Sequence, residues 1–270
     1  FRDPMAQDGY PADPLTWQRF TEIETEAMRN ACFSLFTTPG AARVYRQRYP
    51  EAAERVVVLE NGYDEESFSG VQSGDSAPIN PGAITLLHSG VVYPAERDPT
   101  ELVVALRLLK ERGRLAAGQL KVRFRAAGHE QLLGQLANTH GVEEFIECCP
   151  PVSYREAIAE MLRADGLLVM QAANCNEQIP AKIYEYLRAQ RPIIALTDPA
   201  GDTAKTLAAA GVKDIVPLDS APAIADQLVR FVDAVKRAAI ELPSPDSVRK
   251  ASRRERTAEL VTLLNTVRSR

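Results

Sequence analysis

From residue 83 onward, short apolar runs alternate with longer segments in which apolar residues recur at helical spacing. Apolar runs of this length predict buried strands, and the longer periodic segments predict amphipathic helices. Short apolar strands separated by helices are typical of a parallel sheet covered on both faces, and right-handed crossovers make such a sheet doubly wound. The expected strands are residues 84–87, 121–126, 143–147, 166–170, 192–196 and 214–217, and the expected helices are residues 99–112, 130–139, 154–163, 180–190, 202–210 and 222–239. The sequence therefore predicts an α/β protein with a doubly wound parallel sheet.

The first part of the chain has a different pattern. Its apolar spacing predicts a helix at residues 12–30, a strand at 32–36, a helix at 41–48 and a strand at 55–59. These elements are too few to close a layered domain of their own. Since the chain also begins with Phe1 rather than an initiator Met, we expect a piece of a longer protein in which residues 1–64 end a domain that begins upstream.

Composition places two further boundaries. Residues 65–82 contain several Ser and Gly residues and two prolines, which is typical of a linker. Residues 246–268 are rich in Arg and predict one long terminal helix. We therefore expect the sheet domain to span residues 83–240 and a separate helical segment to span residues 241–270.

Overall composition excludes several classes of protein. Hydrophobic residues make up 45% of the chain and charged residues 25%, as in an ordinary globular protein. A formal net charge of −4 gives no sign of a nucleic-acid surface, and the longest apolar runs are far too short to span a bilayer. The four cysteines lack the spacing of a disulfide framework or a zinc site, so we expect free thiols in a reducing cytoplasm and no metal.

The stretch at residues 176–187 carries the clearest chemical signal. Pro180 suits the first position of a helix, because its fixed φ is helical and its missing N–H is not needed there. Glu177 then lies in the preceding loop and Glu185 on the second turn, with the unpaired amides of a helix N-terminus between them, where a phosphate is favoured. This arrangement suits a sugar nucleotide. Alternatively, the spacing of the two carboxylates arises by chance, and Glu185 pairs with Lys182 or Arg188 on a solvated face.

Glu177 and Glu185 resemble the Glu-x7-Glu motif of retaining GT-B glycosyltransferases. The likeness is strongest to the family 4 enzymes, which read Pro-x-Lys-x-x-Glu-Tyr-Leu before an Arg-Pro turn, as residues 180–187 and 191–192 do here. This resemblance implies that residues 83–240 form a Rossmann-like domain that binds a nucleotide sugar.

Two other short segments support the resemblance. Residues 2–4 (Arg-Asp-Pro) and 61–64 (Asn-Gly-Tyr-Asp) match positions that mark the end of the family's N-terminal, acceptor-side domain. In GT-B proteins the C-terminal helix crosses back to that domain, which implies the same path for residues 241–270.

The loop after the strand at residues 84–87 is a candidate diphosphate site. Gly90 permits close approach of the backbone, and Arg97 can neutralise a diphosphate with its planar fork of donors. The family pattern has a Gly and a basic residue seven positions later, which these two residues match. A second basic residue that often follows the Gly is replaced by Val91. The alternative is that Arg97 pairs with Asp98 or Glu101 on the surface.

A base pocket is expected after the strand at residues 143–147. Family members place the base at this strand end, so the resemblance assigns it to residues 149–152, with Cys149 and Pro150 presenting peptide groups and Val152 beneath the ring. Alternatively, the two prolines only end the strand and Ser153 caps the next helix.

The loop after the strand at residues 166–170 resembles the family loop that faces the transferred sugar. The resemblance implies that Glu177 binds sugar hydroxyls and Glu185 the ribose hydroxyls. Lys182 is either structural or directed at the phosphate. The residues expected to approach the phosphate through their backbone groups are Gln178, Ile179 and Pro180.

Together these expectations describe a retaining glycosyltransferase that moves a sugar from a nucleoside-diphosphate sugar to an acceptor. Glu177 and Arg97 are the expected catalytic residues, without a cofactor or a required metal, and UDP is expected ahead of GDP in the donor. The acceptor, whether glycan, lipid or small molecule, stays open, as does peripheral membrane contact through the preceding domain. We expect this chain alone to bind a donor without transferring sugar. A silent nucleotide-sugar-binding module and a GT-B nucleotide-sugar epimerase are the alternatives.

Overall fold

The computed structural model describes residues 1–7, 9–71, 77–116 and 118–268. Within them a six-stranded parallel sheet has the order β5-β4-β3-β6-β7-β8. The chain starts at the centre of this sheet, winds outward to one edge, and returns to wind to the other, so the expected doubly wound α/β fold is confirmed. The strands are β3 (Ile84–Ser89), β4 (Leu120–Arg125), β5 (Ile146–Cys149), β6 (Gly166–Gln171), β7 (Ile193–Thr197) and β8 (Ile215–Val216).

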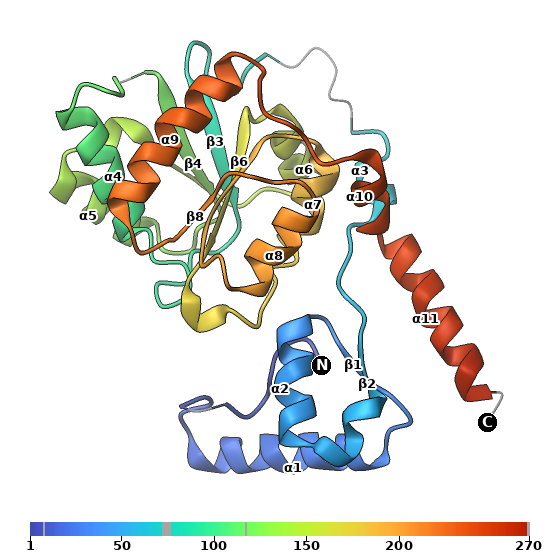
Figure 1. The fold of residues 1–270 in the computed structure, drawn as a ribbon. Coiled ribbons are helices and arrows are strands. Elements are labelled where there is room, and N and C mark those ends of the chain that lie inside the picture. Colours follow the sequence, from blue (N-terminus) through green and yellow to red (C-terminus); the bar gives the residue numbers. More distant parts are fainter. Residues whose placement is uncertain (8, 72–76, 117, 269–270) are drawn as a thin grey trace.

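Helices cover both faces of the sheet (Figure 1). Successive strand residues point to opposite faces, so Leu86 joins the core under one helical layer and Leu87 the core under the other. The first layer consists of α4 (Thr100–Glu111), α5 (Glu130–His140) and α9 (Ala221–Lys236), and the second of α6 (Tyr154–Arg163), α7 (Lys182–Ala189) and α8 (Asp202–Ala209).

The N-terminal residues form a smaller unit with its own core. It contains α1 (Pro14–Asn30), β1 (Ser34–Phe36), α2 (Pro39–Arg48), the 3₁₀ helix η1 (Pro50–Arg55) and β2 (Val56–Val58), with β1 and β2 paired in parallel. Fully buried Glu24 joins α1 to α2, because the hydroxyls of Tyr45 and Tyr49 donate to its carboxylate at 2.5 and 2.8 Å and Arg48 pairs with it at 2.5 Å. A buried carboxylate is tolerated when it is paired and hydrogen-bonded in this way.

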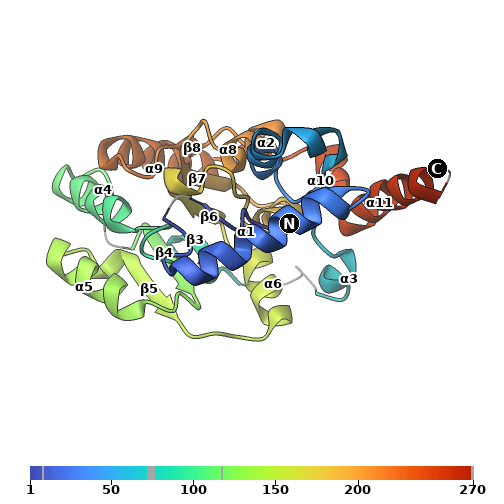
Figure 2. The ribbon, with the colours of Figure 1, turned by 90° about the horizontal axis from the view of Figure 1, so that it is seen from below.

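This unit lies at the carboxyl ends of the main strands. In Figure 2, which shows the molecule from below, α1 crosses in front of the sheet. The N-terminus of α2 meets the loop after β6, where Thr38 donates to the Glu177 carbonyl at 2.6 Å and the Gly40 amide donates to the Asp202 carboxylate at 2.5 Å. A Cβ at Gly40 would lie 2.8 Å from the Glu177 Cα, so only glycine allows this approach.

The C-terminal segment returns to the same junction, but as two helices. The expected single helix at residues 246–268 is wrong, because α10 (Pro245–Lys250) and α11 (Arg253–Arg268) are separated at Ser252. There the backbone leaves the helix to pair with Tyr63, through the Arg253 N–H to the Tyr63 carbonyl at 2.8 Å and the Tyr63 N–H to the Ala251 carbonyl at 3.1 Å. An Arg256–Glu60 ion pair at 2.6 Å fixes the start of α11 beside the connection between the units.

Two other expectations need correction. The linker at residues 65–82 contains a helix, α3 (Glu65–Phe68), because buried Phe68 packs against Tyr63. Glu143–Phe145 is a 3₁₀ turn that precedes β5, since the Phe145 N–H bonds back to Val142 and its ring enters the core. Residues 72–76 of the linker and residues 269–270 of the terminal segment lie outside the described residues.

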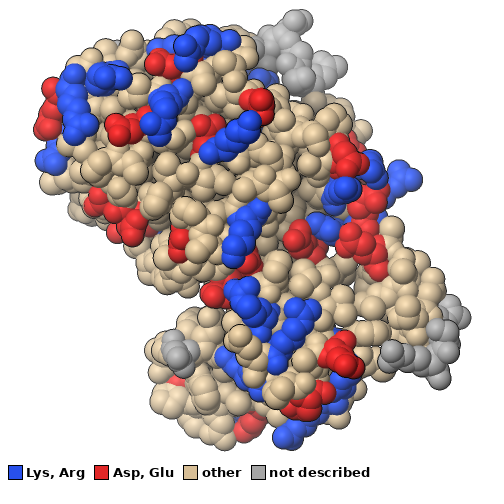
Figure 3. Space-filling model, in the orientation of Figure 1, with Lys and Arg blue, Asp and Glu red and all other residues tan. Residues whose placement is uncertain are grey.

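Neither the surface charge nor the cysteines single out a functional site. On the face in Figure 3, basic and acidic side chains are interspersed over the molecule. All four cysteines are free, with Cys149 and Cys175 buried. Among the described residues, no helix has the length and apolar character needed to cross a bilayer.

Candidate functional site

A cleft of about 530 Å³ opens between the N-terminal segment and the carboxyl ends of β3 and β6. Those two strands are adjacent in the sheet but belong to its two opposite windings, so the cleft lies at the topological switch point, where doubly wound sheets bind ligands. Its walls come from three segments of the chain. They are the N-terminal segment (Arg2, Asp3, Pro4, Gln7, Tyr10), the β3–α4 loop (Tyr93, Ala95, Glu96, Arg97) and the β6–α7 loop (Gln171, Asn174, Cys175, Gln178, Ile179, Pro180).

Arg97 reaches this cleft in a fixed orientation. One terminal nitrogen donates to the Val91 carbonyl at 2.8 Å, and the guanidinium lies 5.1 Å from the centroid of the Tyr93 ring. Its Nε is buried without a hydrogen-bond partner. Within the described part of the chain, neither Asp98 nor Glu101 pairs with it. The alternative, in which Arg97 forms an ion pair with Asp98 or Glu101 on the surface, is therefore wrong for this structure.

Lys182 comes from α7 to the same loop. Gly90 has a φ of +110°, and a Cβ added there would lie 3.3 Å from the lysine Nζ, so the ammonium sits against the glycine backbone. Position 91 is Val91, and the second cation at this loop comes from the first residue of α7 instead. Burial, aided by Arg97, lowers the pKa of Lys182 to about 7.

The lysine is held in turn by His88, a fully buried residue of β3. The His88 Nε2 lies 3.1 Å from the lysine Nζ, and its Nδ1 lies 3.1 Å from the Leu168 carbonyl oxygen on β6. Burial lowers the pKa of His88 well below its usual value, so the ring is neutral at physiological pH.

One turn along α7, Glu185 faces the start of α6. The Tyr154 hydroxyl donates to its carboxylate at 2.6 Å, whereas Arg188 pairs with Glu65. Burial raises the pKa of Glu185. Burial of Tyr154 and its hydrogen bond to the Glu185 carboxylate raise the pKa of Tyr154 to about 12. Positions three apart share one face of a helix, so Lys182 and Glu185 are presented side by side.

The stretch expected to read a base is only partly free to do so. Cys149 belongs to β5, and its carbonyl accepts from the Ala126 N–H at 2.9 Å. The Pro150 carbonyl accepts from Arg125 at 2.6 Å. Val152 is 39% exposed, and the chain continues through Ser153, which caps α6 in a capping box. The Ser153 cap is thus confirmed, and Val152 remains an open apolar surface.

The loop before α7 departs from the expected geometry in one respect. Pro180 is not the first helical residue, because the Ile183 N–H bonds to the Pro180 carbonyl in a tight turn and α7 begins at Lys182. Gln178, Ile179 and Pro180 line the cleft. Glu177 is not among the lining residues, since its main chain is packed against α2.

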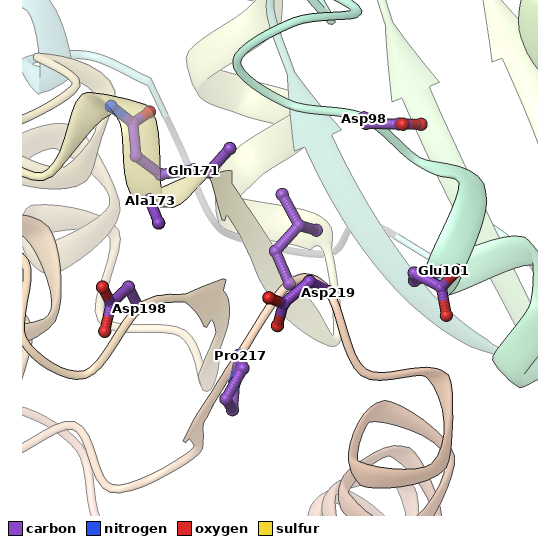
Figure 4. A pocket seen from close by; sticks show the side chains of 9 residues that line it. Asp98, Glu101, Gln171, Ala173, Asp198, Pro217 and Asp219 are labelled. Atoms are coloured by element: carbon purple, nitrogen blue, oxygen red, sulfur yellow. The ribbon is translucent and has the colours of Figure 1, made fainter.

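A second hollow, of about 390 Å³, lies beyond the ends of β6, β7 and β8. Figure 4 shows the carboxylates of Asp98, Glu101, Asp198 and Asp219 around it; Asp98 lies just before α4 and Glu101 in its first turn, whereas Asp198 and Asp219 follow β7 and β8. No Lys or Arg is among its lining residues. Four carboxylates would repel an anion such as a diphosphate.

Two residues of this arrangement were missed by sequence reasoning, His88 and Tyr154. His88 lies one residue before the end of β3 and carries no motif that distinguishes it from a core residue. Tyr154 is 31 positions from Glu185, so only the fold brings them together. Within the described residues, no cluster of three His, Cys, Asp or Glu side chains has the arrangement of a metal site.

No family model matches the sequence, and no curated protein sequence matches it. By structure the chain is similar to a trehalose 6-phosphate synthase from Burkholderia multivorans, with 14% identity over 95% of this chain and 64% of that one, at a TM-score of 0.65. It is similar to the sucrose-phosphate synthase of Thermosynechococcus elongatus, with 12% identity over 100% of this chain and 67% of that one, at a TM-score of 0.69. A pneumococcal O-GlcNAc transferase, solved with UDP and GlcNAc, matches with 12% identity over 92% of this chain and 48% of that one, at a TM-score of 0.63.

These neighbours are GT-B glycosyltransferases. At such low identity the likeness establishes the fold, and the chain spans about two thirds or less of each neighbour's length. The chain therefore has the α/β fold of the GT-B glycosyltransferases, including a Rossmann-like domain built on the six-stranded parallel sheet.

Proposed function

We propose that this chain is the donor-binding half of a retaining GT-B glycosyltransferase related to family 4, and that it binds a nucleoside-diphosphate sugar. The observation that carries the proposal is the convergence of two cations on the β3–α4 loop at the switch point, with Lys182 against the positive-φ Gly90 and Arg97 bonded to the Val91 carbonyl. Within the described residues, neither cation is paired with a carboxylate. Two uncompensated cations beside an open loop are suited to a diphosphate.

The rest of the donor follows from this placement. Glu185 would accept from the ribose hydroxyls, with Tyr154 displaced or shared, and the base would extend over Val152. The sugar would point into the cleft toward Gln178, and Glu177 would approach it from the junction with α2.

The chemistry would depend on electrostatics. When the sugar leaves its donor, negative charge accumulates on the departing diphosphate, and Arg97 and Lys182 are already in place to stabilise it. Preorganised donors of this kind are each worth about 3–4 kcal/mol of barrier in other enzymes. The protein would therefore need little rearrangement at the diphosphate during the reaction.

UDP is the proposed nucleotide. The pneumococcal transferase was solved with UDP, and the Burkholderia vietnamiensis neighbour is a UDP-forming synthase. The acceptor is left open because the neighbours differ in it.

Calorimetric titration of this chain with UDP, GDP and ADP tests donor binding. We expect UDP to bind, and Arg97→Met to weaken it, whereas Arg114→Met, an exposed change at the far end of the sheet, should leave it unchanged. Absence of heat or thermal shift with all three nucleotides at millimolar concentration would overturn the proposal.

Transfer is a separate test, which also distinguishes an enzyme from a silent binding module. A GT-B active site needs an acceptor-facing wall, and orientation alone is worth roughly 7–11 kcal/mol of barrier. We therefore expect this chain to bind UDP-sugar without transferring it. The longer protein should hydrolyse or transfer the donor with retention of anomeric configuration, and a longer protein that binds but never turns over would favour the binding module.

A further inference from the structure

We propose that His88 is a positioning residue that aims the Lys182 ammonium at the donor diphosphate, and that this pair couples nucleotide binding to the uptake of a proton. The inference rests on the proposed function, since it concerns the same diphosphate site. It assigns a role to a buried side chain that the sequence presents as ordinary core.

The hydrogen bonds determine which nitrogen of His88 carries the proton. The Leu168 carbonyl oxygen, 3.1 Å from Nδ1, can only accept, so Nδ1 must be the donor. A neutral imidazole with Nδ1 protonated has a lone pair on Nε2. The lysine side chain can donate to that lone pair across the 3.1 Å between Nζ and Nε2.

This arrangement fixes the orientation of the Lys182 side chain. One of its three N–H donors is used by His88, which leaves the others for a ligand. The ammonium is held against Gly90, where a side chain would meet the Nζ at 3.3 Å. A phosphate that approaches over the glycine backbone would therefore meet a lysine already oriented by β3 and β6.

The charges around Lys182 make its protonation responsive to a ligand. Neutral His88 on β3, the Arg97 guanidinium on the following loop and the Glu185 carboxylate on α7 face it. Burial and Arg97 lower the pKa of Lys182 to about 7, and Glu185 acts in the opposite direction without overcoming them. A bound diphosphate adds negative charge and raises this pKa again.

The sign of the pH dependence follows. Above pH 7 the free protein holds a largely neutral amine, and the complex holds an ammonium, so binding takes up a proton. Affinity for UDP should then fall as pH rises from 7 toward the pKa of the complex, by at most about ten-fold per pH unit. Below pH 7 the lysine is already protonated, and this dependence should disappear.

Calorimetry at pH 8 in two buffers of different ionisation enthalpy measures the proton directly. Wild-type protein should take up about one proton per UDP, and Lys182→Met should take up none. His88→Leu keeps the packing against Phe124 but removes the acceptor, so UDP affinity should fall roughly ten-fold, the effect of a hydrogen bond to a charged group. His88→Gln restores an acceptor and should recover most of the loss, and thermal melting of each variant identifies any that fails to fold.

A second readout needs no nucleotide. In protein with ¹⁵N-labelled histidine, NMR should show His88 as a neutral ring protonated on Nδ1 from pH 5 to 9. A ring protonated on Nε2, or one that titrates near pH 6.5, would overturn the inference even if the variants were unstable. UDP binding that is unchanged in folded His88→Leu would also overturn it, while failure of wild-type protein to bind UDP would instead remove the proposed function.

Discussion

Two hollows lie at the same edge of the sheet and share one wall residue, Gln171, yet they differ in charge, because the larger is lined by Arg2 and Arg97 as well as by Asp3 and Glu96. The larger lies at the switch point, beside the loop where Arg97 and Lys182 converge without carboxylate partners in the described chain. The smaller, a short distance along the sheet, is lined by four carboxylates and no cation.

The difference shows that shape alone does not locate a ligand in this fold. Both hollows are large enough for part of a nucleotide, and both follow parallel strands. Only the first combines the switch point, an open glycine backbone and unpaired positive charge. Topology and charge therefore both favour the first hollow as the donor site of the proposed function.

The largest expected effect is on UDP binding. It comes from removing the positive charge of Arg97 beside the larger hollow, and it is compared with removing a negative charge from the smaller hollow. Arg97→Met should weaken UDP binding by about 2–3 kcal/mol, because the diphosphate loses hydrogen bonds from a charged donor. Asp219→Asn, which removes a charge from the acidic hollow, should change it little. Titration calorimetry on both variants checks this, and a larger effect for Asp219→Asn would reverse the assignment of the two hollows.

Glu185 tests the nucleoside end of the same cleft. Glu185→Ala should weaken UDP binding by roughly 1–3 kcal/mol, since the ribose hydroxyls lose a buried acceptor. Wild-type protein should bind 2′-deoxy-UDP less tightly than UDP, whereas the variant should bind the two nucleotides with equal affinity. Tyr154→Phe is the matched control, because it frees the carboxylate without removing it. Equal sensitivity of variant and wild type to the absent hydroxyl would show that Glu185 does not contact the ribose.

The strands of the sheet could be predicted from the sequence because the pattern that marks a buried strand lies within the strand itself. An apolar run such as residues 166–170 can only be buried on both faces, and β6 is indeed buried throughout. Gly90 and Arg97 were placed by the same logic, since they follow a strand whose carboxyl end had to face the ligand edge. The strand at residues 143–147 was misplaced because Glu143 begins a 3₁₀ turn, a structure that leaves no periodic signal.

What the sequence could not predict depends on contacts between distant segments. The break at Ser252 depends on Tyr63, and the hold on Lys182 depends on His88, 94 positions earlier. Neither partner is identifiable until the fold brings them together. The same is true of Glu177, whose main-chain position is set by Thr38 and Gly40 of the N-terminal unit.

The lowered pKa of Lys182 predicts a pH effect on stability. The folded pKa, about 7, lies below the ordinary value of 10.5, so the unfolded chain binds more protons between these values and stability rises with pH. The slope should not exceed about 1.4 kcal/mol per pH unit, and partial exposure should reduce it. The free energy of unfolding, measured with urea at pH 7, 8 and 9, should rise with pH more steeply in wild type than in Lys182→Met. The same pH dependence in both proteins would mean that the lysine is not desolvated.

The smallest expected effect concerns the residue that the two hollows share. Gln171 is 2% exposed, its Oε1 has no hydrogen-bond partner, and its amide nitrogen makes only a long bond of 3.4 Å to the Cys175 carbonyl. An unpaired buried carbonyl destabilises a protein, so Gln171→Met, which keeps the length of the side chain, should leave stability unchanged or raise it by less than about 1 kcal/mol.

Ligand binding then shows which hollow this amide serves. If its free oxygen accepts from a hydroxyl of the donor sugar, Gln171→Met should weaken UDP-sugar binding and leave UDP binding intact. Paired titrations of wild type and variant with UDP and UDP-glucose measure that difference. Equal losses for both ligands would place the amide at the diphosphate, and no loss for either would show that the amide does not contact the donor.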